Sequence, residues 1–281
     1  KIEKTIYNFR PDIVIFGHAD KINGEMLDDM KSKYNKLKIA QWFLDPLSKK
    51  GPDYSKNKSR ILDKDKLIDA SFVTTDPSAL DFNIKNAFFM PNPCDESLDN
   101  LKIYNRNPDN DVFYAISHGV HRGILREGKL DERELFIKKL LKYCKGVNFD
   151  IYGMFNKQPI WGQEFLNVLT NSKMGLNLSR GKPVKYYSSD RIAQLLGNGI
   201  LTFIHKDTKY NDFFSNKEII FYKDIHDLSE KIKKYKKDNK QWRIIAKNAQ
   251  VKYHTHFNSN KVAKFIIDKT LGIKSKFYWE K

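Results

Sequence analysis

The stretch from Ser117 to Lys129 combines residue types that bind anions, and it follows an apolar run, 111–117, that is typical of a buried strand. It holds three glycines, two histidines, two arginines and a lysine. Glycines let backbone N–H groups approach an anion closely, and Arg122, Arg126 and Lys129 would neutralise its charge. The spacing matches neither a P-loop nor a G-x-G-x-x-G site, so an ordinary basic loop is the alternative interpretation.

A second polar stretch, 179–191, separates the apolar run 174–178 from a short helical segment at 189–196. One of its two consecutive serines, or the aspartate after them, can cap that helix. A helix N-terminus carries about half a positive charge and free N–H groups, which suit a phosphate. A helix cap without a ligand is the alternative. The candidate ligand-binding side chains here are Arg180, Lys185, Ser188, Ser189, Asp190 and Arg191.

Polar residues also follow the first two apolar runs of the chain, 12–16 and 37–44. His18 and Asp20 come after the first run, and Asp45 comes after the second. Each of the three is a candidate general base, and histidine titrates near neutrality. In the alternative interpretation, His18 is an ordinary residue of a turn.

Strand-like and helix-like segments alternate along the chain, which predicts βαβ units and parallel sheets. We expect residues 46–60 to form a loop, and residues 92–110, rich in Asn, Asp and Pro, to form a linker. The expected strands are 12–16, 37–44, 70–75, 86–90, 111–117, 147–152, 174–178, 200–204 and 218–222. The expected helices are 24–35, 131–145, 162–171, 189–196, 225–237, 240–253 and 259–270.

Two such series joined by a linker predict an α/β protein with two doubly wound, Rossmann-like domains facing a cleft. We expect the first domain at 1–105, the second at 106–258, and a helix and tail at 259–281 that could cross back to the first. Ligands of open parallel sheets bind beyond the carboxyl ends of the strands. All three polar groups described above are expected at such ends.

Composition excludes several classes of protein. The 281 residues are 40% hydrophobic, which is too apolar for a disordered chain, and no run approaches the ~18 apolar residues of a membrane span. Two cysteines are too few for a disulfide framework and fit a reducing compartment.

The chain is basic, with a net charge of +17, and part of this charge comes from the lysine run 231–237. This run can be a solvated helix face, an anionic-lipid contact or a nucleic-acid patch. Only nine of the 51 basic residues are arginine, which weakens the nucleic-acid interpretation.

Several segments together resemble GT-B-fold glycosyltransferases of group 1, most closely their spore-maturation-protein-like branch. The segment S-S-D-R-I-A-Q-L-L-G-N-G-I-L-T-F, 188–203, resembles that family's R-x-x-E-x-x-A-x-G segment. Residues 210–214 and 218–228 resemble its L-x-x-x-F and E-x-x-x-Y-x-D-x-x-E-L segments, and 89–95 resembles its P-N-x-x-D segment. The resemblance covers about residues 10–270 and implies an N-terminal domain that is truncated here.

The resemblance implies that the second domain binds the donor nucleotide-sugar. Arg122 and Lys129 would face the diphosphate, Gly153 would lie near the base, and the helix start at 188–191 would meet the phosphates. Many relatives have two glutamates at the positions of Tyr186 and Gln194, the second of which holds the ribose; Gln194 could hydrogen-bond a hydroxyl without a full charge. The complete set of expected donor-binding residues is His118, Gly119, Arg122, Lys129, Gly153, Arg180, Lys185, Ser188, Ser189, Asp190, Arg191 and Gln194.

The function we expect is a metal-independent glycosyltransferase that uses a nucleotide-sugar as co-substrate, has no other cofactor and acts on a glycan or lipid-linked acceptor. No metal site is expected, because His118 and His121 have no third ligand nearby and no D-x-D motif stands in a matching place. The expected location is cytoplasmic, peripheral to the inner face of a membrane through 231–237. A non-catalytic module of the same fold and a nucleic-acid-binding protein are the two alternative functions.

Overall fold

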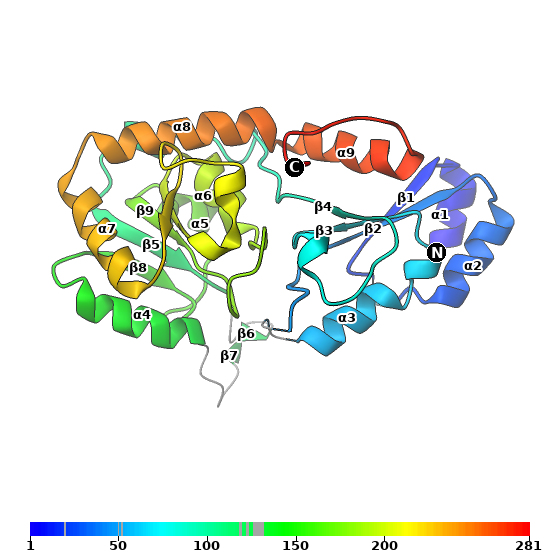
Figure 1. Cartoon of the computed structure of the whole chain (residues 1–281), viewed down its shortest axis with the longest axis horizontal. Helices are drawn as coiled ribbons and strands as arrows, with labels where there is room; N and C mark the ends of the chain where they lie inside the picture. Colours follow the sequence, from blue (N-terminus) through cyan, green and yellow to red (C-terminus); the bar gives the residue numbers. More distant parts are fainter. Residues whose placement is uncertain (20, 50, 52, 118–119, 122–123, 126–131) are drawn as a thin grey trace. The chain divides into compact units, whose positions relative to one another are not determined.

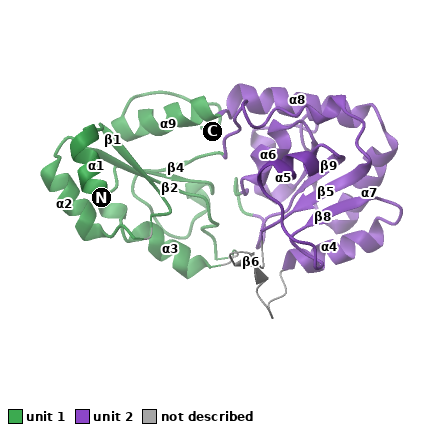
Figure 2. Cartoon of the chain, turned by 180° about the vertical axis from the view of Figure 1, so that it is seen from behind, with its two compact units in different colours: residues 1–91, 184–187, 259–281 green, residues 92–183, 188–258 purple. Residues whose placement is uncertain are grey.

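The computed structural model describes residues 1–281 except 20, 50, 52, 118–119, 122–123 and 126–131 (Figure 1). The described chain forms two compact units, coloured separately in Figure 2. Unit 1 comprises 1–91, 184–187 and 259–281, and unit 2 comprises 92–183 and 188–258. Each unit contains a parallel sheet, so the predicted α/β fold with two parallel sheets is confirmed. Residues 92–105, expected in the first domain, lie in unit 2, and residues 259–281 lie in unit 1.

Unit 1 contains a four-stranded parallel sheet in the order β1-β2-β3-β4. The strands are β1 (Ile13–Gly17), β2 (Lys38–Phe43), β3 (Ala70–Val73) and β4 (Ala87–Phe89). The helices are α1 (Ile2–Phe9), α2 (Gly24–Lys33), α3 (Tyr54–Leu62) and α9 (Ser259–Leu271), with short 3₁₀ turns at Asp65–Leu67 and Pro77–Ala79. The late helix α9 contacts β2 and β3, where the rings of Phe265 and Phe72 lie 5.5 Å apart. Its burial against the sheet explains why it folds with unit 1.

Helix α3 occupies a segment that we expected to be a loop, and that prediction is wrong over residues 54–60. The helix is polar in composition, which hides its periodicity. Its buried side chains are Asn57 and Ile61, one turn apart, and Asn57 Nδ2 donates a hydrogen bond to the carbonyl oxygen of Pro46. A buried asparagine satisfied by a backbone partner therefore replaces the apolar residue that a helical pattern would require.

Unit 2 contains a five-stranded parallel sheet in the order β11-β10-β9-β5-β8. The strands are β5 (Asn110–Ala115), β8 (Phe149–Tyr152), β9 (Ser172–Asn177), β10 (Leu201–His205) and β11 (Ile220–Tyr222), and a two-stranded ribbon pairs β6 (Val120–His121) with β7 (Ile124–Leu125). The helices are α4 (Glu132–Tyr143), α5 (Gly162–Leu169), α6 (Arg191–Gly197), α7 (Ile225–Lys237) and α8 (Gln241–His256). Short 3₁₀ turns lie at Ile103–Asn105, Lys206–Thr208 and Tyr210–Asp212.

The central strands of unit 2 are buried on both faces, which is why they are continuous apolar runs in the sequence. The helices around them are amphipathic. In α7, Leu228, Ile232 and Tyr235 recur at helical spacing and are buried, and the Asp224 carboxylate caps the helix by accepting the N–H of His226 and of Asp227. None of the helices in the described chain is long and apolar enough to cross a membrane.

Candidate functional site

The order of strands in unit 2 identifies one place where a ligand crevice is expected. The chain runs from β5 to β8 on one side of β5, and then to β9 on the other side of β5. In an open parallel sheet, this reversal opens a crevice beyond the carboxyl ends of the two central strands. The crevice of unit 2 is therefore expected beyond Ala115 and Asn177, where β5 and β9 end.

Arg191 joins the ends of these two strands. Its Nε donates to the carbonyl oxygen of Ala115 at 3.1 Å, and its Nη1 donates to the carbonyl oxygen of Leu178 at 3.1 Å and to Ser189 Oγ at 3.0 Å. The guanidinium carbon lies 5.2 Å from the centroid of the Tyr114 ring, whose hydroxyl also donates to the carbonyl oxygen of Leu178. Arg191 is 8% exposed, and its Nη2 makes no hydrogen bond to a described residue. The structure thus fixes a cation at the strand reversal.

Buried hydrogen bonds hold Ser188, which precedes Arg191 by three residues. The Ser188 hydroxyl is fully buried and hydrogen-bonds the side-chain amide of Asn177 at 2.9 and 3.1 Å, and the Ser188 carbonyl oxygen accepts from Asn92 Nδ2. Helix α6 begins at Arg191 with Asp190 at the N-cap position, and this residue makes no side-chain cap hydrogen bond. The expectation that Ser188, Ser189 or Asp190 caps the helix is therefore wrong, because the serine hydroxyls bond other partners and Asp190 is exposed.

Gly153 lies directly after β8, at the same end of the sheet. Its φ is +77°, and a Cβ at this position would overlap the carbonyl oxygen of Ile116, which follows β5. Only glycine fits a backbone that is both left-handed and this close to a neighbouring strand end. The close approach brings the ends of β5 and β8 together beside Arg191's partner Ala115.

The remaining expected donor-binding residues have different surroundings. Arg180 and Gln194 are partly exposed and lie after β9 and within α6, respectively. Lys185 lies in unit 1, where its Nζ is 2.7 Å from Asp76 Oδ2. His118, Gly119, Arg122 and Lys129, together with the candidate base Asp20, lie outside the described residues.

At the carboxyl end of the unit 1 sheet, the structure brings His18 and Asp45 together, with His18 Nδ1 3.7 Å from Asp45 Oδ2. His18 Nε2 accepts the backbone N–H of Leu44 at 3.0 Å, and Nδ1 faces the Asp45 carboxylate. The His18 ring stacks on Phe43 with centroids 4.4 Å apart. These contacts fix the imidazole between two consecutive strand ends.

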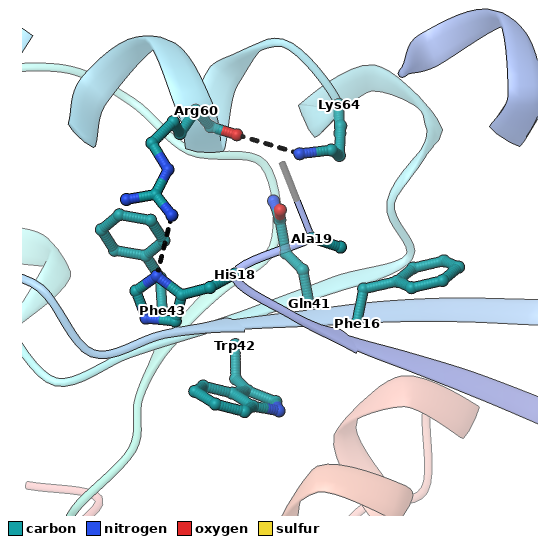
Figure 3. Close-up of a pocket in the computed structure, with 8 residues that line it drawn as sticks. All are labelled: Phe16, His18, Ala19, Gln41, Trp42, Phe43, Arg60 and Lys64. Atoms are coloured by element: carbon teal, nitrogen blue, oxygen red, sulfur yellow. Dashed lines mark hydrogen bonds between the residues drawn. The ribbon is translucent and has the colours of Figure 1, made fainter. Parts of the chain in front are cut away.

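Arg60 of α3 completes this cluster and was not anticipated from the sequence. Its Nη1 lies 3.3 Å from Asp45 Oδ2, and its Nη2 lies 3.3 Å from His18 Nδ1. The guanidinium also lies over the Phe43 ring, at 5.3 Å. Figure 3 shows Arg60 and His18 pointing toward each other at a small pocket that Gln41 and Lys64 also line. We missed Arg60 because its segment was expected to be a loop.

Two further features bear on the expected partners. No group of three or more metal-ligating side chains occurs among the residues that the structure describes.

In the run 231–237, Lys231 pairs with Asp227, Lys233 with Glu230 and Lys236 with Asp111, whereas Lys234 and Lys237 are exposed. Intramolecular ion pairs therefore use much of the positive charge of this run.

Comparison with known proteins gives a family and a fold. Residues 126–268 match the model of a family described as glycosyl transferase-like. A search of the curated proteins found no match to this sequence.

Among solved structures, Anabaena HepE in complex with UDP aligns with a TM-score of 0.66 and 12% identity, over 96% of this chain and 81% of that one. A glycosyltransferase from Rickettsia africae aligns with a TM-score of 0.62 and 11% identity, over 97% and 79%. Sucrose-phosphate synthase from Thermosynechococcus elongatus aligns with a TM-score of 0.60 and 10% identity, over 97% and 76%. At these identities the likeness establishes the fold, which is that of the GT-B glycosyltransferases.

Proposed function

Because the chain belongs to the glycosyl transferase-like family, we propose that it transfers a sugar from a nucleoside-diphosphate sugar to a glycan or a lipid-linked acceptor. Such an acceptor would assign the protein to the synthesis of a surface polysaccharide or glycolipid. Membership of the spore-maturation-protein-like branch and transfer of a hexose are the finer parts of this proposal.

The donor diphosphate binds at the strand reversal of unit 2, and the observation that carries this proposal is the position of Arg191. Its guanidinium is anchored through Nε and Nη1, so the two N–H groups of Nη2 remain to meet a phosphate oxygen. A buried, pre-oriented guanidinium is well suited to a developing diphosphate charge, because it needs no reorganisation during the reaction. Arg122 and Lys129 of the segment that follows β5 add further positive charge, and Gly153 lies near the nucleoside base.

On the acceptor side, we assign the general base to Asp45 and a positioning role to His18. The Nε2 lone pair of His18 is engaged by the Leu44 N–H, and its Nδ1 lies beside Arg60 and Asp45, so both ring nitrogens already have partners within the chain. The Asp45 carboxyl group is half exposed, and its carboxylate can accept a proton while Arg60 and His18 hold it in place. In the transfer, the acceptor oxygen bonds to the anomeric carbon, the bond from that carbon to the diphosphate breaks, and the hydroxyl proton passes to Asp45.

The leaving diphosphate is neutralised by the side chains of the chain itself, so we propose that the reaction needs no divalent cation. Turnover would then persist in EDTA at the rate measured with Mg²⁺. Loss of turnover in EDTA and its recovery with Mg²⁺ would contradict this part of the proposal and leave the rest standing.

A donor screen tests the central proposal. UDP is the first probe because HepE, a structural neighbour, was crystallised with UDP. We expect one of UDP, GDP and dTDP to raise the melting temperature of the purified chain, and the corresponding nucleotide-sugar to release nucleotide slowly by hydrolysis, whereas CMP should not raise it. Binding without any release would favour the non-catalytic alternative. Binding of random duplex DNA with a steep negative dependence on salt, and of no nucleotide, would favour the nucleic-acid alternative.

Peripheral attachment to the inner face of a membrane is the remaining part of the proposal. It depends on the exposed Lys234 and Lys237, each worth about 1 kcal/mol near an anionic surface. Co-sedimentation with vesicles containing phosphatidylserine, compared with vesicles of phosphatidylcholine alone, measures this attachment.

A further inference from the structure

One connecting segment is shared between the two units. Residues 178–190, which we call the strap, link β9 to α6. The two ends of the strap, 178–183 and 188–190, belong to unit 2, whereas its tip, 184–187, belongs to unit 1. Both ends of the strap therefore lie in the unit that holds the proposed donor site, and its tip is part of the other unit.

The two ends of the strap are fastened to each other within unit 2. Arg191 bonds the carbonyl oxygen of Leu178 and the hydroxyl of Ser189, and the Asn177 side chain bonds the hydroxyl of Ser188. The first limb has a further tether, since the N–H of Gly181 donates to Glu132 Oε1 at 2.6 Å. These contacts close the base of the strap.

The tip is held in unit 1 by Asp76, which lies three residues after the end of β3. Asp76 Oδ2 pairs with Lys185 Nζ at 2.7 Å, and the Asp76 N–H donates to the carbonyl oxygen of Lys185 at 3.1 Å. Asp76 also accepts the N–H of Ser78 at 2.8 Å. Burial by itself would raise the pKa of Asp76, but the bonds from Lys185 and Ser78 outweigh it and lower that pKa, so the carboxylate is charged at neutral pH.

Tyr186, at the tip, has a backbone conformation that needs external support. Its φ is +61°, which is rare for a bulky residue and costs about 1–3 kcal/mol. The side chain is buried, and its ring lies 4.9 Å from that of Phe89 at the end of β4. Strain of this kind persists only where surrounding contacts enforce it. The contacts of the tip within unit 1 therefore hold Tyr186 in this conformation.

We propose that Asp76 and Lys185 are positioning residues for the transfer reaction, which hold the tip of the strap in unit 1 and thereby orient Ser189 and Arg191 at the donor site. This inference rests on the proposed function. The four Cα–Cα steps from Lys185 to Ser189 span at most about 14 Å, so a fixed Lys185 limits where Ser189 can lie. The Lys185 ammonium group then pairs with Asp76 and does not contact the donor.

Three substitutions at the pair test this role. Lys185→Met removes the charge and keeps the aliphatic stem, Lys185→Arg keeps the charge, and Asp76→Asn can still accept the N–H of Ser78. With UDP-glucose as donor, we expect Lys185→Met and Asp76→Asn to lower kcat for UDP release about tenfold while KM and the Kd for UDP change less than twofold. Lys185→Arg should retain most of the wild-type kcat. Lys182→Met, on an exposed lysine of the same strap, is the matched control and should leave all three constants unchanged.

Chymotrypsin provides a readout that does not depend on activity, because Tyr186 and Tyr187 lie in the tip and are buried. Cleavage there should become about tenfold faster in Asp76→Asn and Lys185→Met, and stay unchanged in Lys182→Met. A wild-type kcat or an unchanged cleavage rate in Asp76→Asn would overturn the inference. So would a tenfold weaker Kd for UDP in Lys185→Met alone, since Lys185 would then contact the donor. A wild-type chain that releases no nucleotide from any donor contradicts the proposed function instead, and the cleavage rates still decide whether Asp76 holds the tip.

Discussion

Arg191 donates a hydrogen bond to the carbonyl oxygen of Ala115 across 76 positions of sequence, at 3.1 Å. Through its second bond, to Leu178, the same side chain joins the ends of the two strands between which the unit 2 sheet reverses its order. One arginine thus contributes to the packing of the strand ends and presents its remaining N–H groups at the expected crevice. These two roles can be separated by experiment.

Substitution of Arg191 should affect both stability and nucleotide binding. Arg191→Ala leaves the carbonyl oxygens of Ala115 and Leu178 with fewer partners, so we expect unfolding to cost about 3 kcal/mol less. Arg191→Lys should recover part of the stability, but nucleotide affinity should remain at least about tenfold weaker, because an ammonium cannot bond the strand ends and a phosphate together. Calorimetry with UDP and urea unfolding measure the two effects. Lys223→Ala, at an exposed cation just after the edge strand β11, is the control, and an equal loss of affinity there would argue against a specific site.

Gly153→Ala should be much more destabilising than an alanine at another left-handed glycine. Gly146 has φ of +79° with no atom within 4 Å of a built Cβ, so Gly146→Ala should cost only the backbone term of about 1–2 kcal/mol. At Gly153 the overlap with Ile116 adds about 1–3 kcal/mol, because a strand end must move. Urea midpoints of the two variants test the difference, and equal midpoints would show that the contact with Ile116 relaxes freely.

Asp45 and His18 should differ in their effect on turnover. Asp45→Asn removes the proposed base and should lower the rate of transfer about 10²–10⁴-fold, with the Kd for nucleotide unchanged. His18→Gln should be milder than His18→Ala, because the glutamine oxygen can accept the Leu44 N–H as His18 Nε2 does. His226→Ala, at an exposed histidine in the first turn of α7, serves as the control. If Asp45→Asn keeps wild-type turnover while His18→Gln abolishes it, the two roles are reversed.

The stability of unit 1 should fall in acid partly because of Asp69. Burial would raise the pKa of Asp69, but the N–H of Ile39 and the ammonium groups of Lys31 and Lys38 outweigh it and hold that pKa below its ordinary value of 3.8. A carboxyl group whose pKa is lower in the folded state stabilises the fold above about pH 4, and this contribution disappears as pH falls through the folded pKa.

We therefore expect Asp69→Asn to be about 1–3 kcal/mol less stable than wild type at pH 7, and the difference to shrink toward pH 2–3. Urea unfolding at pH 7, 5 and 3 measures this. Asp28→Asn, at an exposed aspartate in α2 of the same unit, should show no such dependence, and a pH-independent difference for Asp69→Asn would contradict the ion-pair explanation.

The sequence alone determined the order and type of most elements. Each of the nine expected strands occurs within two residues of its predicted bounds, because strands buried on both faces are apolar runs that stand out from polar surroundings. It also identified His18, Asp45 and Gly153 just after strand ends, and Arg191 at the start of a short helix. It failed at α3, where a buried asparagine interrupts the helical pattern and local composition indicates a loop.

Only the tertiary structure decided which of those residues meet. Arg191 reaches Ala115, Arg60 reaches His18 and Lys185 reaches Asp76 over separations of 76, 42 and 109 positions. Periodicity reports which face of an element is buried, but it contains no information on the strand that becomes its neighbour. That choice depends on how whole elements pack. It places Arg60 beside a candidate base, and it places Lys185 in unit 1 although the segments 92–183 and 188–258 on either side of 184–187 form unit 2.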